Sequence, residues 1–198
     1  MGVMNTATYI LRGPATRLYA YLLWVLAGVA IISSFGYGVR AFVATALVAA
    51  ILALVGWLCY WNPRVILNDE GVTIINPSRT FTVPWEAVES TSGKWGLQVT
   101  PQEHKPIHVW AIPGRAGVSD SFSKPRVEKA VVWDEHSGIE NLKVTAGRAA
   151  TIIEMRMEEL RAERPGGTDK NITVMTVHLI PLGAIAVLTA LAAILVAF

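Results

Sequence analysis

The chain has 198 residues, of which 53% are hydrophobic and 16% charged, with a mean hydropathy of +0.43, which is too apolar for an ordinary soluble domain. The net charge is +2, and the segment from Asn62 to Asn171 is close to neutral, which argues against nucleic-acid binding because that needs clustered Lys and Arg. The single cysteine, Cys59, excludes an intrachain disulfide and a multi-cysteine metal site.

An N-terminal arm, residues 1–17, precedes two apolar runs. They are Leu18–Phe35 and Ala41–Trp61, separated by the turn signal Gly36-Tyr37-Gly38. Each run is close to the ~20 residues that cross a hydrocarbon core, so residues 18–61 are predicted to form a transmembrane helical hairpin. A cleaved signal peptide is the competing interpretation of the first run, but a second apolar run follows it at once.

The stretch from Arg64 to Ile112 has the character of a β-rich domain. It starts directly after the helix stop Asn62-Pro63, without a linker. A short helical turn is predicted at Trp85–Ser90. The predicted strands are Arg64–Leu67, Val72–Ile75, Thr80–Val83, Gly96–Thr100 and Ile107–Ile112.

The turn Asn76-Pro77-Ser78-Arg79 predicts a hairpin with a defined register. Asn suits the first position of a type I turn and Pro the second. Pro84 lacks a backbone donor and should end the second strand. The expected pairs are Ile75 with Thr80, Ile74 with Phe81, Thr73 with Thr82 and Val72 with Val83. This register places Val72, Ile74, Phe81 and Val83 on one apolar face, and a slip by one residue would expose them to water.

These residues also carry a resemblance to a known family. The segments Leu67-Asn68-Asp69-Glu70-Gly71-Val72, Asn76-Pro77-Ser78-Arg79-Thr80, Val83-Pro84-Trp85, Val88 and Val109-Trp110-Ala111-Ile112-Pro113 resemble the bacterial pleckstrin-homology-like (PH-like) domain of actinobacterial membrane proteins, a group often labelled after a low-molecular-weight protein antigen. The resemblance covers about a quarter of the chain. It implies a bent antiparallel β-barrel of seven strands with a C-terminal helix, and no agreed ligand. Residues 62–170 are therefore expected to form a PH-like domain.

Two features of this region depart from simple strand patterns. Residues 113–142 form a long polar loop in which Val127–Trp133 is a sixth possible strand and Asp134–Gly138 a turn, and the seventh strand has no clear position. Residues 146–163 are predicted to be a helix with Thr145 as N-cap and a stop at Pro165-Gly166-Gly167. Its apolar stripe favours a helix that covers the barrel over one that binds a partner. Its solvent-facing side is expected to carry Arg156, Glu158, Glu159 and Arg161.

Residues 171–198 are predicted to contain a third transmembrane helix, because Leu179–Phe198 has no charged residue. Pro181 suits its first turn, which leaves His178 at the interface, whereas a helix starting at Thr173 would include His178. Small residues form stripes on the second and third spans, Ala186 and Ala190 among them. These stripes either pack the spans on each other or dock on another membrane protein.

No catalytic, cofactor or metal motif is present in the sequence. His104 and His108 are separated by Pro106, and the cluster Asp134-Glu135-His136 suits a solvated turn. The loop Asn68–Gly71 is acidic where phosphoinositide-binding relatives are basic, so phosphoinositide binding is not expected. Trp95 and Trp110 form a possible interaction surface, although a barrel core or the membrane surface would accept them equally.

The sequence therefore predicts a non-enzymatic PH-like interaction or scaffold module anchored in the plasma (inner) membrane. The alternative is an accessory or assembly subunit of a larger membrane complex, bound through its helices. The lipid bilayer and a second membrane protein, or another copy of the chain, are the expected partners. Basic residues flanking the spans place the N-terminus and the β-rich domain in the cytoplasm and the C-terminus outside. They are Arg12, Arg17, Arg64, Arg161, Arg164 and Lys170.

Overall fold

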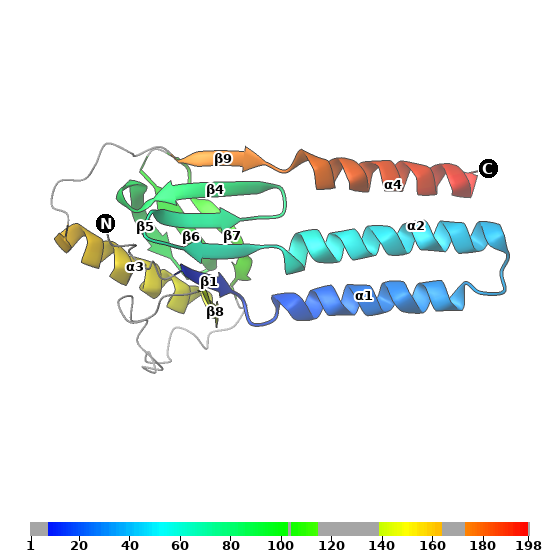
Figure 1. The fold of residues 1–198 in the computed structure, drawn as a ribbon, viewed down its shortest axis with the longest axis horizontal. Coiled ribbons are helices and arrows are strands. Elements are labelled where there is room, and N and C mark those ends of the chain that lie inside the picture. The colour runs from blue at the N-terminus through cyan, green and yellow to red at the C-terminus, as the bar shows by residue number, and fades with distance from the viewer. Residues whose placement is uncertain (1–7, 103, 115–138, 164–172, 198) are drawn as a thin grey trace, which may run out of the picture. The chain divides into compact units, whose positions relative to one another are not determined.

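The computed structural model describes residues 8–102, 104–114, 139–163 and 173–197. The chain divides into two compact units. The β unit comprises Met1–Pro14, Arg64–Asn76 and Thr80–Thr176, and the helical unit comprises Ala15–Pro63, Pro77–Arg79 and Val177–Phe198 (Figure 1). Each unit is built from segments far apart in the sequence.

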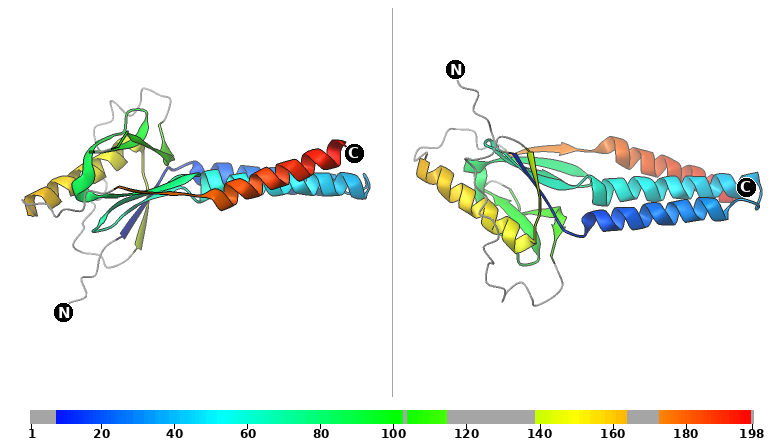
Figure 2. Two further views of the ribbon diagram at one scale, coloured as in Figure 1. Left: turned by 90° about the horizontal axis from the view of Figure 1, so that it is seen from above. Right: turned by 60° about the horizontal axis from the view of Figure 1, so that its bottom comes forward.

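The helical unit confirms the predicted helical hairpin. Helix α1 spans Thr16–Ser33, and α2 spans Val39–Gly56 and continues as a π-helical turn, η1, over Trp57–Trp61. Between α1 and α2 the backbone has φ values of 102° at Gly36 and 89° at Gly38, which suit glycine because it lacks a Cβ atom. A third apolar helix, α4, spans Leu179–Ala197, and α2 lies between α1 and α4 (Figures 1 and 2).

Aromatic side chains join α1 to the end of α2. The Trp24 indole Nε1 donates a hydrogen bond to the Ala53 carbonyl at 3.1 Å, and its ring centroid lies 5.3 Å from that of Trp61. The Arg17 guanidinium lies 4.7 Å from the centroid of Trp61. Gly56 makes room for this packing, because a Cβ atom there would come 2.9 Å from Trp24 Nε1.

Hydrogen bonds from other segments of the helical unit hold both ends of helix α4. It starts at Leu179, so the alternative start at Thr173 is wrong, and Pro181 lies in the first turn as predicted. His178 precedes the helix, and its backbone N–H donates to the Ser78 carbonyl at 2.9 Å. At the other end, Arg40 Nη2 donates to the Leu195 carbonyl at 3.0 Å, where a cation suits the negative end of the helix dipole.

The strands of the β unit form two sheets. The first has six strands in the order β8-β1-β2-β3-β4-β9, and the second has three in the order β5-β6-β7. Strand β1 pairs with β8 in parallel and with β2 in antiparallel orientation. The bounds are β1 Thr8–Arg12, β2 Arg64–Leu67, β3 Gly71–Ile75, β4 Arg79–Pro84, β5 Val88–Ser92, β6 Gly96–Pro101, β7 Ile107–Pro113, β8 Ile139–Lys143 and β9 Val174–Val177.

The β3–β4 hairpin has the register that its turn predicted. The Cα partners are Val72 with Val83, Thr73 with Thr82, Ile74 with Phe81 and Ile75 with Thr80. Three of the four predicted apolar-face residues, Val72, Ile74 and Val83, are completely buried, and Phe81 packs against them. Pro84 is the last residue of β4, as expected from its missing donor.

Four strand assignments correct the predictions from sequence. The N-terminal arm contains β1, the helical turn ends at Ala87 where β5 begins one residue later, the polar loop ends in β8, and β9 precedes α4. Strands β1 and β8 are short and pair with each other across the sequence, so no local turn signal marks them. The predicted strand Val127–Trp133 and the turn Asp134–Gly138 lie outside the described residues, as does the stop after residue 163.

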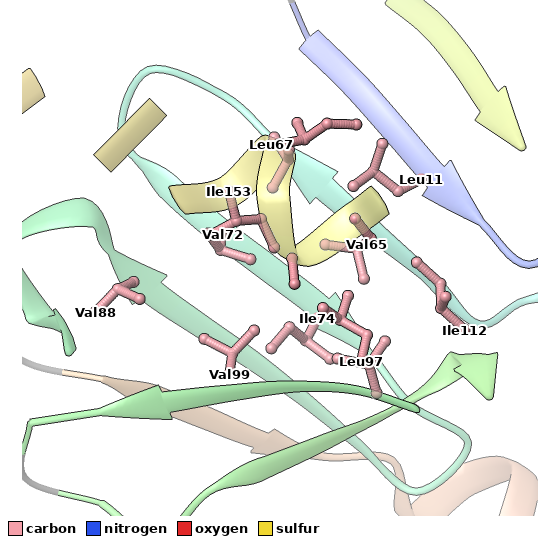
Figure 3. Packing of buried hydrophobic residues seen from close by; sticks show 14 of the residues in the cluster. Leu11, Val65, Leu67, Val72, Ile74, Val88, Leu97, Val99, Ile112 and Ile153 are labelled. Carbon is pink, nitrogen blue, oxygen red and sulfur yellow. The ribbon is translucent and has the colours of Figure 1, made fainter. Parts of the chain in front are cut away.

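The hydrophobic core of the β unit is formed by both sheets and helix α3, Ala146–Glu163, whose bounds agree with the prediction (Figure 3). Leu11, Val65 and Leu67 point into this core from β1 and β2, and Ile153 points into it from α3. The α3 stripe Ala146, Ala150, Ile153 and Met157 is buried, and Leu160 packs against the core. Thr145 Oγ1 accepts a long N-cap hydrogen bond, 3.5 Å, from the Arg148 N–H.

The described strands form two separate sheets and close no barrel, and the first sheet is mixed because of the parallel pair β1–β8. The resemblance implied an antiparallel barrel of seven strands. The structure therefore establishes an architecture of apolar helices, a β-rich unit with two sheets and an apolar C-terminal helix.

Candidate interaction surfaces

Trp95 and Trp110 are exposed on the three-stranded sheet. Trp95 lies in the β5–β6 turn with 87% of its surface accessible, and Trp110 lies on β7 with 51% accessible. On β7, Ile107, Val109 and Ala111 are buried, so Trp110 projects from the opposite face as the alternation predicted. The possibility that these tryptophans fill a barrel core is therefore wrong, and the membrane surface and a partner remain as their possible environments.

The backbone edge of β7 is occupied by other parts of the β unit. Asn76 Nδ2 donates to the His108 carbonyl at 2.8 Å, and the Trp110 N–H donates to Asn76 Oδ1 at 2.9 Å. The Gly13 N–H donates to the Ala111 carbonyl at 2.8 Å. Because these bonds cover part of the edge, strand addition at β7 is blocked there.

The residues that carry the family resemblance stabilise a turn. Asn68 Oδ1 accepts hydrogen bonds from the N–H groups of Glu70 at 3.2 Å and Gly71 at 3.0 Å, an Asx-type arrangement. The buried Trp85 donates through Nε1 to the Asn68 carbonyl at 2.7 Å. A side chain at Gly71 would meet the backbone of Val83 and Pro84. The contacts within the fold therefore explain why Asn68, Gly71 and Trp85 have these residue types.

Arg156 is not on the solvent-facing side of α3, which corrects the prediction. Its side chain is only 12% exposed and pairs with Asp69 at 3.4 Å and with Glu159 at 3.3 Å. The hydrophobic stem of Arg can be buried while its guanidinium pairs with carboxylates, which explains the position. The Arg156–Asp69 pair therefore joins the acidic loop Asn68–Gly71 to α3.

Arg156 also acts on a neighbouring tyrosine. Burial and the Glu140 carboxylate raise the pKa of the Tyr9 phenol, and the Arg156 guanidinium partly offsets this rise.

Ala186 and Ala190 are exposed on α4 and belong to a stripe with Gly183 and Ala193. The half-buried residues of α4 recur every three or four positions on a different side, and this side contacts α2. They are Pro181, Ile185, Leu188, Ala192 and Leu195. The stripe on α4 therefore does not pack on α2. On α2 the small residues Ala49 and Gly56 are buried.

The remaining polar candidates do not come together in the described part of the chain. His104 is exposed in the β6–β7 loop and His108 is exposed on β7. Among the described residues, no group of three or more His, Cys, Asp or Glu side chains has the arrangement of a metal site. The cluster Asp134-Glu135-His136 lies outside these residues.

Comparisons with models of known protein families, with curated proteins and with solved structures found no match for this chain.

Proposed function

We propose that this protein is a non-enzymatic interaction or scaffold module, anchored in a membrane by its apolar helices and presenting a PH-like domain in the cytoplasm. The observation that carries the proposal is the exposure of Trp95 and Trp110 on one sheet of the β unit. Exposed tryptophans are enriched at protein interfaces because one ring buries a large area at small entropic cost.

Membrane anchoring is supported by the length and exposure of the helices. Helix α1 and the continuous segment Val39–Trp61 are each long and apolar enough to cross a bilayer, and the apolar part of α4, Leu179–Leu195, is shorter. Only 17% of the apolar window is buried in each of the two longer segments, Thr16–Ser33 and Val39–Trp61, whereas the core helix of a soluble protein is mostly buried. Large aliphatic side chains such as Val25 and Ile32 would face water unless lipid surrounds them.

The PH-like assignment is supported by the order of elements and by the structural roles of the shared residues. Strands β2 to β7 follow one another, and α3 packs on the core after them. The two sheets have a common core between them, as the layers of a flattened barrel do. The assignment describes a fold and brings no ligand with it.

The proposed topology predicts different labelling at two engineered cysteines. The basic residues Arg12, Arg17 and Arg64 flank one end of the first two spans. At the other end of the hairpin only Arg40 is basic, and it lies in the first turn of α2, where it caps α4. With Cys59 replaced by alanine, Tyr37→Cys should react with a membrane-impermeant maleimide in intact cells. Lys105→Cys should react only after permeabilisation. Labelling of Lys105→Cys alone, or equal labelling of both in intact cells, contradicts this orientation.

The interaction proposal predicts loss of a partner when the exposed tryptophans are removed. A protein, or a second copy of the chain, should co-purify with the wild type in mild detergent, and Trp95→Ala with Trp110→Ala should reduce its yield at least tenfold. Tyr37→Ala, which removes a ring that is 78% exposed in the helical unit, is the control and should leave co-purification unchanged. Equal losses in both variants contradict the proposal.

The alternative function, an accessory subunit docked through its helices, is favoured by the exposed stripe on α4. Small residues let helix backbones approach closely in lipid, where hydrophobic attraction between helices is absent. Under this alternative, Ala186→Leu with Ala190→Leu abolishes co-purification while the β unit stays folded. Ala184→Leu, an exposed change outside the stripe, should have no effect. Retention of the partner by both variants leaves the tryptophan surface as the binding site.

A further inference from the structure

A cluster of aromatic rings holds Arg17 within the helical unit. The Arg17 guanidinium lies 4.7 Å from the centroid of the Trp61 ring. The Trp61 ring in turn packs against the rings of Trp24 and Tyr21, with centroids 5.3 and 5.7 Å away. Gly56 makes room for Trp24, as described above. The neighbouring rings therefore fix the position of Trp61, and the Trp61 face fixes the position of Arg17.

A π-helical turn at the end of α2 carries Trp61. This turn, η1, spans Trp57–Trp61, and the Asn62 N–H donates to the Trp57 carbonyl at 2.8 Å. That hydrogen bond spans one residue more than the bonds of an α-helix, so Trp61 projects in a different direction than a regular helix would give it. Single π-helical turns are rare and frequently occur at functional sites. The local structure is thus specialised where Arg17 stacks.

The hydrogen-bond donors of Arg17 are available to an anion. The residue is exposed, and among the described residues no hydrogen bond or ion pair reaches its guanidinium. The segments of the helical unit contain no Asp or Glu. Arg17 also lies in the first turn of α1, where the helix dipole disfavours a cation, so helix stability does not explain its position. Stacking on a ring occupies the face of a guanidinium and leaves the N–H groups at its edge accessible.

The aromatic cluster has the composition of a membrane interface. It also includes Tyr19 and Tyr60, whose ring centroids lie 5.5 Å apart. Trp and Tyr are enriched at the level of the lipid headgroups, where one end of the side chain is apolar and the other wet. A headgroup offers phosphate, which the planar fork of Arg binds through two parallel hydrogen bonds. A choline ammonium also binds aromatic faces, but Arg17 with the same charge already occupies the face of Trp61.

We propose that Arg17, held on the ring of Trp61, binds the phosphate group of an anionic phospholipid. This inference rests on the proposed membrane anchoring and uses residues of the helical unit alone. That unit carries Arg17, Arg40 and Arg79 without an acidic residue, so its charge favours an anionic headgroup over a zwitterionic one.

The test measures which lipids the full-length protein retains. The protein is reconstituted into vesicles with equal amounts of phosphatidylglycerol and phosphatidylcholine, and the lipids that remain bound after mild detergent extraction are counted by native mass spectrometry. The wild type should retain phosphatidylglycerol in excess. Arg17→Gln should reduce this excess about tenfold, because a bidentate contact between opposite charges is lost.

Two variants that keep the net charge distinguish the proposed site from a general attraction between cations and an anionic surface. Trp61→Leu removes the stacking surface and Arg17→Lys removes the planar fork, so each should lose most of the excess. Trp61→Phe keeps an aromatic face and should retain it. If Arg17→Lys and Trp61→Leu keep the wild-type excess, the site is overturned. Arg17 is exposed, so Arg17→Lys decides the question if Trp61→Leu fails to insert.

Arg79→Gln is the matched control. It removes one positive charge from another exposed position of the helical unit, next to Ser78, whose carbonyl accepts a hydrogen bond from the residue before α4. This variant should keep the phosphatidylglycerol excess. Equal losses in Arg79→Gln and Arg17→Gln overturn the inference, because the excess then follows the number of charges and not the stacked arginine.

The wild type alone gives three further results that overturn the inference. Stable insertion without a phosphatidylglycerol excess overturns it and leaves the membrane anchoring intact. An excess that millimolar inorganic phosphate abolishes indicates a site for free phosphate and overturns the lipid assignment. Failure to resist alkaline carbonate extraction overturns the membrane anchoring and this inference with it.

Discussion

Val83→Asp should unfold the β unit, whereas Thr82→Asp in the neighbouring position should be tolerated. Val83 has no exposed surface and lies opposite Val72 on the buried face of the β3–β4 hairpin. A carboxylate without a partner in that position costs roughly several kcal/mol, which is a large part of the stability of a small domain. Thr82 is exposed on the other face.

The measurement is protease resistance of the full chain in mild detergent, as a function of pH. Burial favours the neutral acid, so the pKa of a buried aspartate rises above its unfolded value of about 3.9. The penalty is therefore largest at neutral pH and decreases as the pH falls towards 4, because the folded state then binds the proton. If Thr82→Asp is the more damaging change, the hairpin pairing is shifted by one residue.

Gly71→Ala should be the most destabilising of the small substitutions. A Cβ atom at this position would overlap the Val83 carbonyl oxygen and come 2.8 Å from Pro84 Cα, both in the backbone of the neighbouring strand. Backbone cannot move aside as a side chain can, so β3 and β4 must separate locally, at a cost of about 1–3 kcal/mol or more. The turn closed by Asn68, on which Trp85 packs, would be displaced with them.

Gly147→Ala is the matched control for this substitution. Gly147 lies in the first turn of α3, and no heavy atom lies within 4 Å of the added methyl group. Alanine also has the higher helix propensity, so this variant should melt at or above the wild-type temperature. Thermal unfolding of the full chain in mild detergent, followed by circular dichroism, separates the two cases. If Gly71→Ala melts at the wild-type temperature, strands β3 and β4 are not as close at this position as the structure has them.

Much of the fold could be predicted because local patterns reported on local structure. The turn Asn76–Arg79 determined the register of β3 and β4, and the spacing of Ala146, Ala150 and Ile153 determined the buried face of α3. The helical hairpin followed from two uncharged runs separated by glycines. In each case the residues that interact are neighbours in the sequence, so their chemistry alone specifies the pairing.

The candidate surfaces were only partly predictable. The sequence identified Trp95, Trp110, Ala186 and Ala190 but left their exposure open, because a strand or helix pattern does not say which side faces a neighbouring element. The structure places all four in exposed positions.

The sequence by itself determined the apolar helices, the β3–β4 hairpin and the α3 stripe, since each depends on periodicity and turn chemistry within about twenty residues. Only the tertiary structure decided that Thr8–Arg12 and Ile139–Lys143 pair in parallel, and that Asn76 covers the edge of β7. It also decided that Arg156 reaches Asp69. These contacts join residues at least 30 positions apart, and their energy exists only after the core has brought the strands together, so no local signal encodes them.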